Sequence, residues 1–146
     1  MADSSGYGLV VWKKNNLYRL ESPLFRSGSA RIVATGQLSL NLSVGLLGLD
    51  VSPRIFPNEP RYLYFHALTS HNLYMIDTQK INSFSGRLSS ESTNIFRARN
   101  VFPSNAMAQS FSADGTMFTS LSEEYAIICW NRYRNIKHEP FVSYHS

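Results

Sequence analysis

Histidines and carboxylates are the side chains of this sequence that could transfer protons or bind a metal ion. His66 and His71 lie five positions apart, and imidazole groups serve both purposes near neutral pH. Glu123 and Glu124 form a pair of adjacent carboxylates, and Asp114 is a further acid that precedes a glycine. What these groups can do depends on the strands and turns that hold them.

Each of these groups has a competing structural interpretation. Side chains alternate between the two faces of a strand, so His66 and His71 point apart unless the turn between them brings them together. For the same reason, Glu123 and Glu124 between two strands are typical of a solvated turn. The sequence has no Gly-x-Ser-x-Gly elbow and no glycine-rich phosphate loop. We therefore expect no metal site and no cofactor, and the catalytic residues stay unassigned.

The composition is that of one packed domain. Of the 146 residues, 43% are hydrophobic and 13% aromatic, which suits a buried core. Charged residues make up only 16%, which argues against a disordered chain. The net charge is +4 and the basic residues are scattered, so the sequence gives no indication of a nucleic-acid partner.

The single cysteine and the N-terminus bear on the compartment. Cys129 has no second cysteine for an internal disulfide, so it is either a small buried side chain or pairs outside this sequence. The sequence contains no run of about 18 apolar residues, so no membrane span is predicted. Residues 1–5 lack the basic start and apolar core of a signal peptide, which indicates a cytosolic protein if Met1 is the true start.

Strands separated by turns recur about every ten residues, a rhythm typical of an all-β sandwich, barrel or propeller. Asp114-Gly115 is a strong hairpin signal between two of these runs. We expect only a short helix near Thr78–Ile81 and an exposed loop over Ser83–Ser92. The predicted strands are Gly6–Trp12, Leu17–Leu20, Gln37–Leu42, Val44–Val51, Arg61–Leu68, His71–Asp77, Met117–Leu121 and Tyr125–Trp130.

Two stretches repeat the order of strand, turn, aromatic strand, turn and strand. The first covers Leu46–Asp77 and the second Ala106–Asn131. Their offset of roughly 60 residues is near the 40–50 residues of a propeller blade with loop insertions.

Several motifs in order resemble the major royal jelly / Yellow family of insect proteins, over nearly the whole sequence. These motifs are Asp3–Trp12, Tyr18–Phe25, Gly48–Pro53, Leu63–His66, Asn105 with Asp114, and Ala126–Asn131. The resemblance implies a six-bladed β-propeller that is normally secreted and much longer than this chain. Residues 1–146 would then be a partial propeller domain of roughly two and a half to three blades, about half of the whole.

The resemblance leaves three functions open. The first is a secreted protein that binds a small aromatic amine or catechol-type ligand and acts in pigmentation or the cuticle. The second is a dopachrome-converting isomerase of melanin formation, which needs an acid and a base near pH 7, for which Asp114 and His66 are available. The third is a nutritive or structural secreted protein without a ligand. We expect binding rather than catalysis.

Two kinds of site are expected, one from the resemblance and one from a sequence motif. Leu46, Gly48, Asn105 and Gln109 are the expected lining of the propeller's central channel, and ordinary strand packing is the competing interpretation. Asn41, in Asn41-Leu-Ser43, is a predicted glycosylation site if the protein is secreted.

Overall fold

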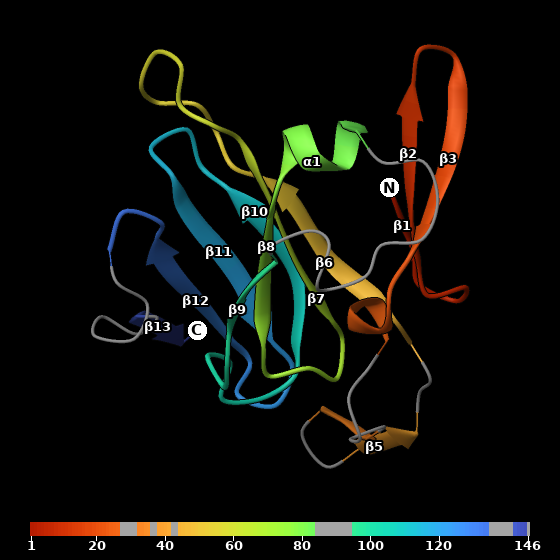
Figure 1. Ribbon diagram of the computed structural model, residues 1–146. Coiled ribbons are helices and arrows are strands. Elements are labelled where there is room, and N and C mark those ends of the chain that lie inside the picture. Colours follow the sequence, from red (N-terminus) through yellow and green to blue (C-terminus); the bar gives the residue numbers. More distant parts are fainter. Residues whose placement is uncertain (27–31, 36–37, 42–43, 84–94, 135–141, 146) are drawn as a thin grey trace.

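The regular structure of the described residues is almost all antiparallel β-sheet, and the all-β prediction is confirmed (Figure 1). A computed structural model describes six stretches of the chain, which are residues 1–26, 32–35, 38–41, 44–83, 95–134 and 142–145. The two short helices in these stretches are a 3₁₀ turn over Pro23–Phe25 and the α-helix α1 over Thr78–Ser83.

The strands form consecutive meanders, in which each strand pairs with the next one along the chain. The sheets have the strand orders β1-β2-β3, β4-β5, β6-β7-β8-β9 and β10-β11-β12-β13. The strand bounds are β1 Ala2–Asp3, β2 Gly8–Lys13, β3 Asn16–Glu21, β4 Ile32–Thr35, β5 Leu38–Asn41, β6 Leu46–Val51, β7 Tyr62–Ala67, β8 Leu73–Asp77, β9 Phe96–Ala98, β10 Ala106–Phe111, β11 Thr116–Leu121, β12 Ala126–Asn131 and β13 Val142–His145.

A meander of four antiparallel strands is the unit from which β-propellers are built, one unit to a blade. The sheets β6–β9 and β10–β13 both have this form, and their first strands β6 and β10 lie side by side (Figure 1). The fold is therefore part of a β-propeller. The number of blades in the chain stays a prediction.

Turn residues explain where the hairpins reverse. Lys14 and Asn15 join β2 to β3 with φ angles of 48° and 61°, the left-handed conformation that a two-residue hairpin turn requires. Gly115 ends the β10–β11 turn at φ 83°, as the Asp114-Gly115 signal predicts. The hydroxyl of Ser112 and the backbone N–H of Thr116 both donate to the Asp114 carboxylate within this turn.

Most of the predicted elements have their counterpart in the structure. The strand expected over Gln37–Leu42 is observed as β5, and the one expected over Val44–Val51 begins at Leu46. The short helix near Thr78–Ile81 is α1. The loop expected over Ser83–Ser92 lies outside the described residues apart from its first residue.

The sheet β6–β9 is covered on both faces. Its strand β7 sends Leu63 and Phe65 into a cluster with Leu9 and Leu20 of the first sheet. On the opposite face, Tyr64 packs in a second cluster, which holds side chains of β11 and β12 such as Met117, Ile128 and Trp130. Five of the six residues of β7 are buried for this reason, although alternating burial is usual for a strand with one face in water.

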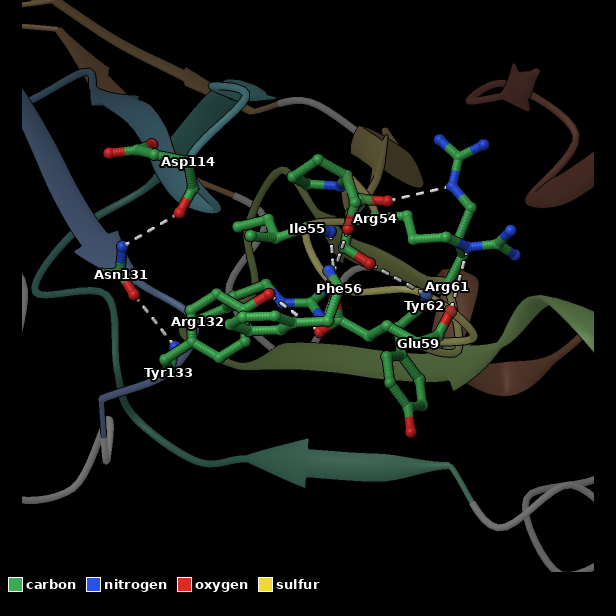
Figure 2. Close-up of polar contacts among 12 residues, drawn as sticks. Arg54, Ile55, Phe56, Glu59, Arg61, Tyr62, Asp114, Asn131, Arg132 and Tyr133 are labelled. Carbon is green, nitrogen blue, oxygen red and sulfur yellow. Dashed lines mark hydrogen bonds and ion pairs between the residues drawn. The ribbon is translucent and has the colours of Figure 1, made fainter.

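The loop between β6 and β7 is tied to the end of β12 by Glu59 (Figure 2). The Glu59 carboxylate accepts hydrogen bonds from the Tyr133 hydroxyl at 2.8 Å and from the Ile55 backbone N–H at 2.9 Å. It also pairs with the Arg132 guanidinium, whose side chain is only 5% exposed. Phe56 packs against Tyr133 with ring centres 6.0 Å apart. We call this group the Glu59 clasp.

The clasp depends on the charge of Glu59. The Ile55 N–H stabilises the carboxylate most, and together with Tyr133, Phe56 and Arg132 it lowers the pKa of Glu59 from 4.5 to about 2, against the opposing effect of burial. Because Arg132 is buried, loss of the carboxylate leaves a buried positive charge without its partner.

We predict that Glu59→Gln lowers the stability of the protein at neutral pH, because the amide cannot neutralise Arg132. The pKa of Glu59 is lowered by folding, so its contribution is complete above about pH 4.5 and is lost as the pH falls toward 2. Urea unfolding between pH 7 and pH 2 measures this: the variant should lose less stability across the acid range than the wild type.

Glu21→Gln is the matched control, because Glu21 is exposed and bridges only Arg19 on the sheet surface. This variant should keep both the neutral stability and the acid profile of the wild type. Identical acid profiles for Glu59→Gln and the wild type would contradict the role of the clasp.

Candidate functional site

The four residues expected to line a channel all lie at or beside the first strands of the two four-stranded sheets. Leu46 is fully buried in the cluster shared with the first sheet. Gly48 pairs with His66 across β6 and β7. Asn105, just before β10, is 4% exposed, and Gln109 donates from its amide to the Tyr64 carbonyl at 2.8 Å. Their packing is clear, and their role in lining a channel stays a prediction.

Gln109 belongs to the contact between the sheets β6–β9 and β10–β13, which we call the seam. Among the described residues, two side-chain hydrogen bonds join β10 to the sheet β6–β9: the one from Gln109, and one from the Phe111 backbone N–H to the Asp50 carboxylate at 2.6 Å. In each of these hydrogen bonds, a side chain of one sheet is the partner of a backbone group of the other sheet. The seam is therefore held by polar contacts as well as by apolar packing.

His66 is the buried titratable group of the seam. Its side chain is fully buried, and its ring packs edge-on to Phe102 with ring centres 5.0 Å apart. The ring lies directly over Gly48, where any side chain would overlap its Nε2 atom. Burial is the main cause that lowers the pKa of His66 from 6.5 to about 4. The imidazole is therefore neutral at physiological pH.

The other histidine and carboxylate side chains considered as catalytic or metal-binding groups lie apart from His66. His71 lies in the β7–β8 turn, where Nδ1 is 2.7 Å from the Phe102 carbonyl oxygen. Glu123 and Glu124 lie exposed in the β11–β12 turn and contact Asn105 and Ser104. The partners of all three residues lie in the segment just before β10.

Asp114 and Cys129 also lie apart from His66. Asp114 is exposed in the β10–β11 turn, and the Ser112 hydroxyl is the main cause that lowers its pKa. Cys129 is a free, half-buried cysteine in the middle of β12. Asn41 lies in β5, paired with Ile32, while Ser43 of the same glycosylation motif is outside the described residues.

An apolar cleft of about 210 Å³ lies between β8, β9 and the end of β12. An apolar cavity of about 150 Å³ is enough to hold a benzene ring. The residues that line it are Tyr64, Leu73, Tyr74, Met75, Phe96, Ala98, Trp130, Arg132 and Arg134. We call this space the aromatic cleft.

Aromatic rings give the cleft its shape. Tyr64 packs against Trp130 with ring centres 6.2 Å apart, and the indole N–H of Trp130 donates to the Arg134 carbonyl at 3.1 Å. Burial raises the pKa of Tyr64 to about 12, so its hydroxyl stays protonated. Phe96 closes the outer side and is 50% exposed.

Sequence reasoning missed this cleft because Phe96 and Trp130 come from different sheets. The Cys129-Trp130-Asn131 motif contains one of its walls, but nothing in the sequence pairs that wall with β9. Among the residues that the structure describes, no three His, Cys, Asp and Glu side chains group closely enough to hold a metal ion. In the same residues, no helix is long and apolar enough to cross a membrane.

We predict that His66 makes the protein less stable as the medium is acidified. Between pH 6.5 and about 4 the unfolded chain binds a proton at His66 and the folded protein does not, so the free energy of unfolding falls as the pH falls. The loss attributable to this group is on the order of 3 kcal/mol over the window. Urea unfolding at several pH values measures it.

His66→Phe keeps a ring of similar shape without a titrating group, so this variant should lose less stability between pH 6.5 and pH 4 than the wild type. His71, which is only half-buried, provides the control: His71→Asn should keep the wild-type dependence. A wild-type dependence in His66→Phe would show that His66 is not its source.

The sequence of this chain is similar to those of known proteins. The sequence model of the family described as "Major royal jelly protein" matches residues 1–146. Major royal jelly protein 9 of Apis mellifera is 27% identical over 140 residues, which cover 94% of this chain and 31% of the relative. Major royal jelly protein 8 of the same species is 27% identical over 138 residues, with 92% and 31% covered.

Major royal jelly protein 2 of Apis mellifera gives the same result, with 24% identity over 143 residues, 95% of this chain and 30% of the relative. The chain thus spans less than a third of the length of these curated relatives. The match over its whole length, together with the meanders of antiparallel strands, shows that the chain belongs to the major royal jelly protein family.

Proposed function

We propose that the protein binds a small aromatic ligand, of the amine or catechol class, in the aromatic cleft. The observation that supports this is a space of about 210 Å³ walled by Tyr64, Phe96 and Trp130. Binding sites for small molecules are concave and mostly apolar, with a few polar groups that orient the ligand. Here Arg132 and Arg134 are the charged residues that line the cleft.

This proposal moves the ligand away from the central channel. Leu46, Gly48 and Gln109 on β6 and β10 are engaged in strand packing and in the seam. The aromatic cleft lies instead between the later strands β8, β9 and β12. A ring bound there would stack against side chains of both sheets at once.

The wider role that we propose is that of a secreted propeller protein acting in pigmentation or the cuticle. Family membership supports it. The isomerase alternative needs a proton-exchanging group near the ligand, and His66 and Asp114, the two residues available for it, are buried in the seam and bound within a turn. A nutritive or structural role without a ligand is the outcome if no aromatic compound binds.

We predict that catechol and dopamine bind to the protein and that Phe96→Ser weakens both. Loss of one ring contact corresponds to about a two- to tenfold increase in the dissociation constant. Calorimetric titration of the wild type and the variant measures it. Phe96 is 50% exposed, so its replacement should leave the fold intact.

Phe118→Ser is the matched control, because Phe118 is 41% exposed on a strand of the other sheet and does not line the cleft. It should bind both compounds as the wild type does. Failure of both compounds to bind to the wild type, or equal weakening by the two substitutions, would refute the proposed site.

We also predict that the protein is secreted and carries a glycan on Asn41. Asn41-Leu-Ser43 is the one Asn-x-Ser/Thr motif of this sequence. Expression of the full coding sequence of the transcript in insect cells should give protein in the medium. Within residues 1–146, Asn41→Gln should remove the only glycan that an amidase releases, while Asn15→Gln should not. Retention of the protein inside the cells would contradict secretion.

A further inference from the structure

His66 presents a buried hydrogen-bond acceptor to the seam. Its Nδ1 atom lies 3.3 Å from the Ala67 carbonyl oxygen, which places the ring proton on Nδ1. The neutral imidazole then carries a lone pair on Nε2, and Nε2 has no hydrogen-bond partner among the described residues. The residue is fully buried. A buried acceptor without a donor destabilises a folded protein.

Gln109 presents a second acceptor. Its amide nitrogen donates to the Tyr64 carbonyl at 2.8 Å, which fixes the orientation of the amide. Its Oε1 atom is therefore the free end of the group, and it is buried without a donor among the described residues.

The strands bring these two acceptors together. Tyr64 and His66 are two residues apart on β7, so both point toward the seam, and Gln109 is held at the Tyr64 carbonyl. The strands β6 and β10 run side by side (Figure 1) and are joined where Phe111 donates to Asp50. Gly48 and Gln109 each lie two residues before that contact. The two acceptors therefore lie at the same part of the seam, Gln109 at the Tyr64 carbonyl and His66 with its imidazole filling the space over Gly48.

We propose that a single internal water molecule bridges His66 Nε2 and Gln109 Oε1 across the seam. Neither atom has a proton to give the other, so the two cannot satisfy each other directly. A water molecule donates two hydrogen bonds and can serve both acceptors at once. Buried waters of this kind make about three hydrogen bonds to groups that would otherwise be unsatisfied.

A crystal structure of the protein tests this directly. We expect one density peak at 2.7–3.2 Å from both His66 Nε2 and Gln109 Oε1. His66→Phe removes one acceptor and should lose the peak. A direct contact between the two side chains, or no peak between them, would overturn the proposal. A peak at about 2.0–2.2 Å with a stability that falls on adding a chelator would identify a metal ion and overturn it as well.

A double-mutant cycle tests the same bridge in solution. His66→Phe and Gln109→Met each remove one acceptor, and their combination removes both. Each single variant raises the unfolding equilibrium constant by some factor. If one water joins the two side chains, the factor for the double variant should be smaller than the product of the two single factors, by at least about threefold. If the factors of the two single variants simply multiply in the double variant, the bridge is refuted.

Ser52→Ala is the control partner in this cycle. Ser52 is also fully buried, but its hydroxyl accepts a hydrogen bond from the Tyr62 backbone N–H, at the end of β7 away from His66. Its effect on the unfolding constant should multiply with that of His66→Phe. If Ser52 and His66 prove to be coupled as strongly as Gln109 and His66, the coupling reflects a general destabilisation of the fold, and the bridge is rejected.

Discussion

Burial of both faces of the β6–β9 sheet is the constraint on which the rest of the structure depends. A strand with one wet face can place its polar side chains there, but β7 has apolar neighbours on both sides. Every polar group that β7 carries must therefore find a partner inside the protein or stay uncharged. The seam, the clasp and the aromatic cleft all lie at the boundary of this sheet with the next one, where that requirement is met in different ways.

Two ionisable residues show how the same constraint is met differently. Glu59 stays charged because it lies on a loop, where two backbone N–H groups, a hydroxyl and a guanidinium surround it. His66 lies inside the sheet, where burial favours the neutral form and its one hydrogen bond among the described residues is to the Ala67 carbonyl. The number of donors that the backbone can supply decides which form is stable.

Much of the fold could be predicted from the sequence, because strands and turns leave local signals. Asp114-Gly115 and the alternation around Leu38 mark a hairpin and a strand without reference to the rest of the chain. The contacts between sheets left no such signal: Glu59 meets Arg132 across 73 positions, and Phe96 meets Trp130 only in three dimensions. Gly48 and Gln109 could be singled out from the family resemblance, but their contacts with His66 and Tyr64 could not be predicted.

Because His66 lies so close to Gly48, the residues that evolution can accept at these two positions depend on each other. A residue larger than glycine at position 48 has no space while the imidazole lies over it, and the ring has no room to retreat because Phe102 packs against it. The order of substitutions in a lineage is thereby fixed: position 66 has to become small before position 48 can become large. Relatives that keep a ring at 66 should keep glycine at 48, so the pair evolves as one unit.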